Sequence, residues 1–180
     1  TIFIIVSKTF NTIETLENAK KIKSWFIENI CEEAIPNHFI AISNNIEGPK
    51  DFGIYSKNIL SIPEWVGGRF SLWGSVGLII SICIGYKNFE KFLSGAREMD
   101  EHFRESPFNK NIPVILALIS IWYNNFFKCE TEAVLPYNQF LSKLPDYLQQ
   151  ASMESNGKSI DRDGNKIKYE TGSIIWGSTG

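Results

Sequence analysis

The apolar residues of the first third of the chain change their spacing in a way that predicts strands separated by a helix. A continuous apolar run at residues 2–6 is typical of a buried strand, and runs near 38–43 and 58–62 predict two more. Between the first two strands, apolar residues recur every three or four positions and predict a helix over 13–30. Its apolar face consists of Ile13, Leu16, Ala19, Ile22, Phe26 and Ile30. This order predicts a βαβ unit with a parallel sheet.

The middle of the chain has helical periodicity, and mixed structure follows it. Pro113 suits the first turn of a helix. After the helices, a strand is predicted at 133–135 and a further helix at 138–152. Asp163-Gly164 is a strong turn signal and predicts a hairpin over 158–167. The predicted helices of the middle are 73–86, 88–104 and 113–127.

Together these elements predict an α/β fold with a mainly parallel sheet and helices on both faces. The pattern shows no internal repeat and no clear linker. The chain begins with a buried-type strand at Thr1–Val6 and ends just after another apolar run, Ile174–Trp176. We therefore expect an internal fragment of a longer protein.

Composition and charge narrow the class of protein. The 180 residues, 43% of them hydrophobic, can bury the core of one domain, or of one domain and part of another. Eighteen Lys and Arg against twenty Asp and Glu give a net charge of −2 without a long run of one sign, so we expect no nucleic-acid partner. The longest apolar stretch, Val76–Ile84, is too short for a bilayer span, so we expect no membrane helix.

The cysteines favour a reducing compartment. Cys31, Cys83 and Cys129 are odd in number and widely spaced, which suits free thiols in the cytosol better than a disulfide framework. Cys83 lies in an apolar run, and we expect it in the core.

The polar segment from Ser7 to Thr12 has two interpretations. It lies between the carboxyl end of a predicted strand and the start of a helix, where hydroxyls, backbone N–H groups and the Lys8 ammonium could bind a phosphate. The same residues could simply cap the helix, with Asn11 and Glu14 as a capping box, or with Thr9 or Thr12 as the cap instead. Without a Walker or G-x-G-x-x-G spacing, the pattern alone favours capping.

Two further segments could carry chemistry. Gly67-Gly68 allows a close backbone approach, and the Arg69 that follows suits a phosphate or a developing oxyanion, although a turn with a solvated arginine is the more general interpretation. Glu154 follows a predicted helix closely; such a carboxylate is usually a surface group, but in a pocket it could act as a general base.

The two histidines favour structural roles. His38 opens a predicted strand. His102 has acidic neighbours, but the chain contains no H-E-x-x-H, no C-x-x-C and no second histidine nearby, so we expect no metal site.

Taken in order along the chain, seven segments resemble the phosphoglucose isomerase family, also called glucose-6-phosphate isomerase. Each string is weak alone, but their common order makes chance a poor explanation. The segments are Ser7–Thr15, Val66–Trp73, Met99–Phe103, Trp122–Phe126, Ala133–Tyr137, Gln149–Lys158 and Ile175–Gly177.

The resemblance implies interconversion of glucose 6-phosphate and fructose 6-phosphate through a cis-enediolate, with no metal and no organic cofactor. Glu154 matches the carboxylate that moves the proton between C2 and C1, and Arg69 matches the guanidinium that stabilises the enediolate. Glu14 matches a carboxylate that orients a catalytic histidine. The positions that match substrate-binding residues are Ser7, Lys8, Thr9, Thr12, Gly68 and Gln150.

The resemblance also implies a three-layer αβα sandwich of the sugar-isomerase type, incomplete here, with most of a first domain at 1–135 and a segment leading into the second half at 136–180. The expected partners are a small sugar phosphate and, for the complete chain, a second copy in a cytoplasmic homodimer. The family's catalytic histidine and ring-opening lysine would lie beyond residue 180, so we expect this piece alone to be inactive. The alternative is a non-catalytic sugar-phosphate-binding module of the same fold; the joint presence of Arg69 and Glu154 favours the enzyme.

Overall fold

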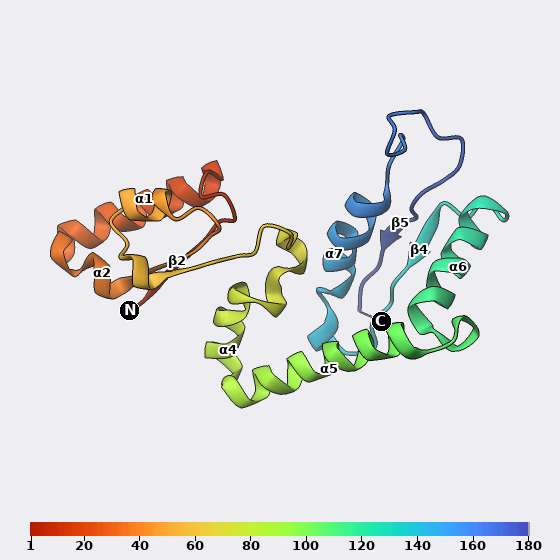
Figure 1. Ribbon diagram of the computed structural model, residues 1–180, viewed down its shortest axis with the longest axis horizontal. Helices are drawn as coiled ribbons and strands as arrows, with labels where there is room; N and C mark the ends of the chain where they lie inside the picture. The colour runs from red at the N-terminus through yellow and green to blue at the C-terminus, as the bar shows by residue number, and fades with distance from the viewer. Residues whose placement is uncertain (180) are drawn as a thin grey trace. The chain divides into compact units, whose positions relative to one another are not determined.

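Strand β1 (Phe3–Val6), helix α1 (Ile13–Asn29) and strand β2 (Phe39–Ile42) form the predicted βαβ unit in this computed structural model, which describes residues 1–179 (Figure 1). β2 pairs in parallel with β1 on one side and with the short strand β3 (Ile59–Leu60) on the other, so it is the central strand of the sheet. The α/β fold with parallel strands is therefore confirmed.

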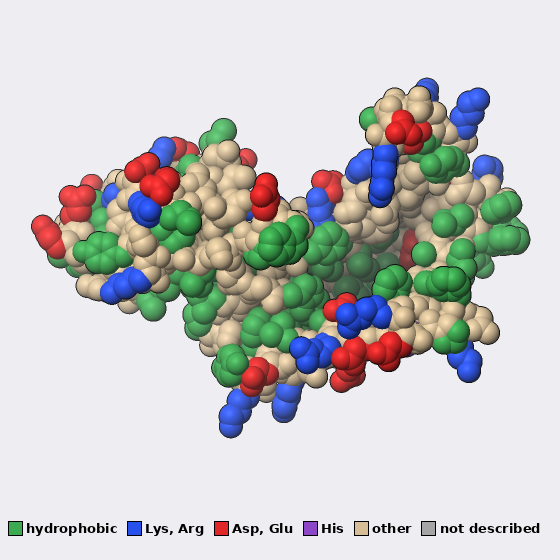
Figure 2. Space-filling model, in the orientation of Figure 1, with side chains coloured by type: hydrophobic (Ala, Val, Ile, Leu, Met, Phe, Trp, Pro, Cys, Tyr) green, Lys and Arg blue, Asp and Glu red, His purple; other side chains and the backbone are tan. Residues whose placement is uncertain are grey.

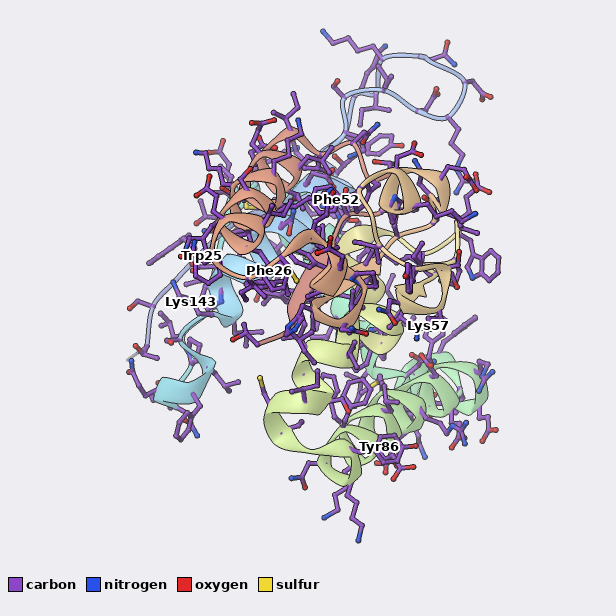
Figure 3. The ribbon with its side chains drawn as sticks, turned by 90° about the vertical axis from the view of Figure 1, so that its left-hand side faces the viewer. Trp25, Phe26, Phe52, Lys57, Tyr86 and Lys143 are labelled. Atoms are coloured by element: carbon purple, nitrogen blue, oxygen red, sulfur yellow. The ribbon has the colours of Figure 1, made fainter. Side chains whose placement is uncertain are left out.

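Aromatic side chains fill the space between α1 and this sheet. Phe26 of α1 meets Phe39 of β2 edge to face, with ring centroids 5.4 Å apart, and both side chains are buried. Phe52 lies 6.2 Å from the Phe39 ring and extends the cluster. Figure 3 shows Phe26 pointing into the interior, while its neighbour Trp25, 53% exposed, points outward. The apolar face predicted for this helix is therefore confirmed only in part, because the spacing alone does not show how far the sheet covers it. Ala19 and Phe26 are buried, but three predicted members are exposed: Ile13, Ile22 and Ile30.

The chain divides into two compact units, Thr1–Lys91 and Phe92–Gly180, and helix α5 (Tyr86–Glu105) contains residues of both. The division expected near residue 135 concerns the domains of the complete protein and stays a prediction. The remaining short helices of the first unit are the 3₁₀ helix Glu32–Ala34, α2 (Ile35–His38), α3 (Glu47–Asp51) and the 3₁₀ helix Ser56–Asn58.

The single helix predicted over 73–86 is wrong in its first half. Two 3₁₀ helices, Gly68–Trp73 and Ser75–Gly77, precede a short helix α4 (Leu78–Ile84). Gly77 lies so close to the Leu72 carbonyl oxygen and the Phe89 ring that a Cβ would overlap both. This tight approach requires glycine and a narrow turn, which the apolar pattern does not reveal.

Cys83 is exposed on α4, so its expected core position is wrong. An apolar run does not indicate which face of a short helix is covered. Cys31 and Cys129 are also exposed, and all three thiols are free.

The second unit contains a parallel strand pair, β4 (Thr131–Ala133) and β5 (Ile174–Trp176), between helices α6 (Ile112–Asn125) and α7 (Leu144–Leu148) (Figure 1). β4 begins two residues before the predicted strand at 133–135. Gly177 follows β5 directly, and a Cβ there would overlap the carbonyl oxygen of Val134.

The single helix predicted over 138–152 is also wrong. A 3₁₀ helix at Gln139–Leu141 comes first, then α7, and then a π-helix at Gln149–Glu154. The predicted hairpin turn is confirmed, because Ile160 pairs antiparallel with Lys166 and Gly164 has a left-handed φ of 84°.

The surface mixes charges of both signs. On the face drawn in Figure 2, Lys and Arg side chains are interspersed with Asp and Glu rather than gathered in one basic patch. In the part of the chain that the structure describes, no helix is both long enough and apolar enough to cross a membrane.

Candidate functional site

The loop after β1 brings two hydroxyls together at the start of α1. Ser7, which is buried, continues the sheet by donating its backbone N–H to the Ile42 carbonyl oxygen at 3.1 Å. Its Oγ lies 3.1 Å from Oγ1 of Thr12, the residue directly before α1. The strand end and the helix start are therefore joined by a pair of hydroxyls.

The predicted capping box is wrong. Asn11 Oδ1 accepts a hydrogen bond from the Thr9 hydroxyl, and Thr12 occupies the N-cap position without a side-chain bond to the helix. Glu14 lies exposed in the first turn of α1, where its charge is favourable to the helix dipole. Because the Thr12 hydroxyl is paired with Ser7, the amino end of α1 gets no cap from it and remains suited to an anion.

Phe10 fixes the shape of this loop, although the sequence pattern did not indicate it. Its φ of 53° is unusual for a bulky residue, and its side chain is buried against Phe52, with ring centroids 6.1 Å apart. A Cβ at Gly48 would lie 2.9 Å from Phe10 Cδ1, so a glycine makes room for the ring. The signal was present as a single aromatic residue within a polar segment.

Lys8 connects the loop to two other segments. Its carbonyl oxygen accepts from Asn44 N–H at 2.9 Å and from the Ser43 hydroxyl at 3.0 Å. Its Nζ donates to the carbonyl oxygens of Glu64 at 2.7 Å and Val66 at 2.9 Å. An ammonium has three donors, so two of them hold the segment that leads into Gly67.

The glycine pair begins a short 3₁₀ helix that contains Arg69. Ser71, which is buried, donates its hydroxyl to the Gly68 carbonyl oxygen at 2.6 Å and fixes this turn. Among residues 1–179, a Cβ at Gly68 would meet no atom beyond its chain neighbours within 4 Å. Packing among these residues therefore does not explain this glycine. An apolar cavity of about 270 Å³ lies beside the turn and is lined in part by Val66 and Trp73.

Gln150 and Glu154 lie on the π-helix of the second unit, four residues apart and both exposed. π-helices are rare and are often found at functional sites. The turn after Glu154 is tight, because Gly157 N–H donates to the Met153 carbonyl oxygen at 2.8 Å and a Cβ at Gly157 would lie 2.6 Å from that oxygen. The Lys158 ammonium donates to the Glu154 carbonyl oxygen.

The structure thus groups the predicted residues in two sets. Ser7, Lys8, Thr9 and Thr12 share one loop of the first unit, and the Lys8 ammonium ties this loop to the segment before Gly68 and Arg69. Gln150 and Glu154 belong to the second unit.

Both histidines make structural contacts. His38 Nδ1 lies 2.6 Å from the Thr1 carbonyl oxygen, and its ring packs 5.0 Å from the Phe26 ring. His102 Nε2 accepts the N–H of Ile112 at 3.0 Å, at the start of α6, and its Nδ1 lies 3.0 Å from Ser106 Oγ. Among residues 1–179, no three His, Cys, Asp or Glu side chains gather as metal ligands.

Comparisons with known proteins agree on one family. The sequence profile of phosphoglucose isomerase matches residues 1–180. Glucose-6-phosphate isomerases of Christiangramia forsetii and of Buchnera aphidicola are 60% and 56% identical over the whole chain, which spans 33% of each. The chain therefore covers about a third of the length of these curated relatives.

Two solved structures also match the whole chain. The crystal structure of a glucose-6-phosphate isomerase from Chlamydia trachomatis matches the whole chain with a TM-score of 0.91 and 33% identity, over 34% of its own length. The crystal structure of a hypothetical protein from Thermus thermophilus matches the whole chain with a TM-score of 0.81 and 25% identity, over 41% of its length. With a family profile that covers every residue and relatives of this similarity, the chain belongs to the phosphoglucose isomerase family.

Proposed function

We propose that the complete protein interconverts glucose 6-phosphate and fructose 6-phosphate. The observation that carries this proposal is the 60% identity, over the whole chain, to a relative named glucose-6-phosphate isomerase. The loop from Ser7 to Thr12 supports it, because it pairs two hydroxyls beside a helix start that lacks a side-chain cap.

In the proposed reaction, Glu154 is the base. Its carboxylate takes the proton from C2 of the open-chain sugar, the C–H electron pair forms the C1–C2 double bond, and the C1 carbonyl oxygen takes the negative charge. The hydroxyl proton moves from O2 to O1, and Glu154 returns its proton to C1, which yields the ketose. Arg69 stabilises the enediolate through its permanent charge.

The other predicted residues bind or orient. Ser7, Thr9 and Thr12 hold the phosphate with the amino end of α1, and Lys8 adds its charge there. Gly68 lets the backbone approach the sugar, and Gln150 binds it with its amide. Glu14 orients a histidine that lies outside residues 1–180. We further propose that the complete chain works as a homodimer in the cytoplasm, without a metal or organic cofactor, and that residues 1–180 alone do not turn over substrate.

The Glu154→Gln variant of the complete protein tests the base assignment. A general base contributes about 10²–10⁴-fold, so exchange of the C2 proton with solvent should fall by at least about 100-fold, while calorimetric binding of the sugar phosphate stays within a few-fold of the wild type. Glu98→Gln, which changes an exposed carboxylate on α5, is the matched control and should exchange normally.

Two outcomes would overturn the proposal. Undiminished exchange in Glu154→Gln removes Glu154 as the base. Binding of the sugar phosphate without any exchange in the wild-type protein identifies a non-catalytic binding module instead of an isomerase.

A further inference from the structure

Both backbone polar groups of Ile175 bond to side chains of the π-helix. Gln149 Nε2 donates to the Ile175 carbonyl oxygen at 3.0 Å. The Ile175 N–H donates to Met153 Sδ at 3.3 Å. Ile175 is the middle residue of β5 and is 6% exposed, so these two contacts lie at a buried position.

Strand geometry explains why Ile175 needs such partners. Ile174 N–H donates to the Glu130 carbonyl oxygen, and the Trp176 carbonyl oxygen accepts from Val134 N–H, so these residues of β5 bond toward β4. Backbone groups of successive residues in a strand point to opposite edges, and those of Ile175 therefore point away from β4. Backbone N–H and C=O groups at a buried position must be satisfied, and at Ile175 two side chains do so.

The two side chains that hold β5 precede the two proposed substrate residues by one position each. Gln149 and Met153 are four residues apart, and so are Gln150 and Glu154. In a π-helix, as in the narrower α-helix, positions four apart lie near one helix face, and the next position is turned by about a quarter of a turn. Fixing 149 and 153 on β5 therefore sets the direction in which 150 and 154 project.

We propose that Gln149 and Met153 are positioning residues for the base, acting through the backbone of Ile175. The inference rests on the proposed function, because it takes Glu154 as the group that moves the proton. Gln149 contributes the stronger, amide-to-carbonyl bond, and Met153 contributes a weak thioether acceptor that also fills half-buried apolar space.

Two substitutions in the complete protein remove one contact each with little change in volume. Gln149→Met removes the donor to the Ile175 oxygen, and Met153→Leu removes the acceptor for its N–H. We expect kcat to fall about tenfold in Gln149→Met and by a smaller factor in Met153→Leu, with KM within about twofold of the wild type. The matched controls are Gln139→Met and Met99→Leu, whose side chains are exposed elsewhere in the chain.

A second readout separates positioning from general stability. In substrate labelled with deuterium at C2, a well-placed carboxylate returns part of the label to C1, and a displaced one loses more of it to water. We expect a larger fraction lost in both variants than in the wild type and the controls. Unchanged kcat, or a lower kcat with wild-type label retention, would overturn the inference.

The Glu154→Gln variant, measured beside them, distinguishes the two proposals. If it abolishes exchange while Gln149→Met and Met153→Leu behave as wild type, only the positioning role fails. If it exchanges normally, the base assignment itself fails, and the positioning role fails with it.

Discussion

The ammonium of Lys8 lies 2.9 Å from the carbonyl oxygen of Val66, fifty-eight residues away in sequence. Together with the bond to Glu64, this contact holds the segment before Gly68 and Arg69 against the loop after β1. Two regions identified separately in the sequence as candidate sites are therefore one connected structure within the first unit.

We expect Lys8→Met to loosen residues 63–69. A hydrogen bond from a charged donor is worth about 1.5–3 kcal/mol, so amide exchange in this segment should accelerate by about 10–100-fold without ligand. Hydrogen–deuterium exchange of the complete protein measures this acceleration. Lys50→Met, which removes an exposed ammonium paired with Glu47, is the control and should leave residues 63–69 unchanged. Equal protection of residues 63–69 in both variants would contradict the role of the Lys8 ammonium in holding this segment.

We expect Gly68→Ala to leave folding intact but to weaken substrate binding. No protein atom lies within 4 Å of the added Cβ, so the melting temperature should stay close to the wild-type value. If the sugar approaches this backbone, KM should rise about tenfold, a loss of ~1.4 kcal/mol. Steady-state kinetics and thermal unfolding measure the two quantities, and an unchanged KM would remove Gly68 from the substrate site.

The opposite result is expected at Gly177. An added Cβ would overlap the Val134 carbonyl oxygen, so Gly177→Ala must separate β5 from the end of β4 and should cost ~2 kcal/mol or more. Gly95→Ala, in the interior of α5 and without a neighbour within 4 Å, is the control and should stabilise by ~0.5–1 kcal/mol. Denaturant unfolding of the complete protein compares them, and a Gly177→Ala variant as stable as wild type would disprove the close approach.

The turn at residues 161–165 should depend on pH. The Asn165 N–H, with smaller contributions from neighbouring donors, bonds to the Asp161 carboxylate and holds its pKa below the ordinary value. Because the folded pKa is the lower one, the carboxylate stabilises the turn above the unfolded pKa, and this contribution is lost as pH falls through the folded pKa.

Amide exchange of Asp163 and Asn165, corrected for the intrinsic rate, measures this effect. Protection should decrease below about pH 4 in the wild type and should be low at every pH in Asp161→Ala. Asp163→Ala is the control, because the turn uses the backbone N–H of Asp163. Protection that is independent of pH in the wild type would refute the role of the carboxylate.

The sequence predicted the structure correctly where a segment with regular apolar spacing packs against a single surface. The burial of Phe26 was predictable because this side chain packs against the sheet, whereas Ile22 of the same predicted face is exposed. The strand at 39–42 was predictable because both its faces are covered. The prediction failed where side chains compete for the same hydrogen-bond partner. Asn11 does not cap the helix because its Oδ1 accepts from the Thr9 hydroxyl instead of from a helix N–H. The spacing of polar residues does not show which of these two donors an Asn oxygen will bind.

Sequence motifs indicated the candidate site residues, whose roles stay predictions, but did not indicate their geometry. The motif at 149–158 indicated Gln150 and Glu154, yet its sequence predicts an ordinary helix, whereas the structure has a π-helix whose Gln149 and Met153 bond to Ile175, a distant residue. β5 was not predicted as a strand because an apolar run of three residues is too short to show the two-residue period of a strand. Phe10 was not predicted because a single aromatic residue in a polar segment does not by itself indicate a left-handed φ.

The parallel pairing of β4 with β5 gives the carrier of the proposed base a partner that comes later in the sequence. Thr131 pairs with Ile174, so the π-helix lies inside the loop that this pairing closes. The side chains of Gln149 and Met153 bond to Ile175, beyond the residues that they precede by one position. A chain cut before β5 would therefore keep Gln150 and Glu154 in its sequence but lose the strand against which their helix is held.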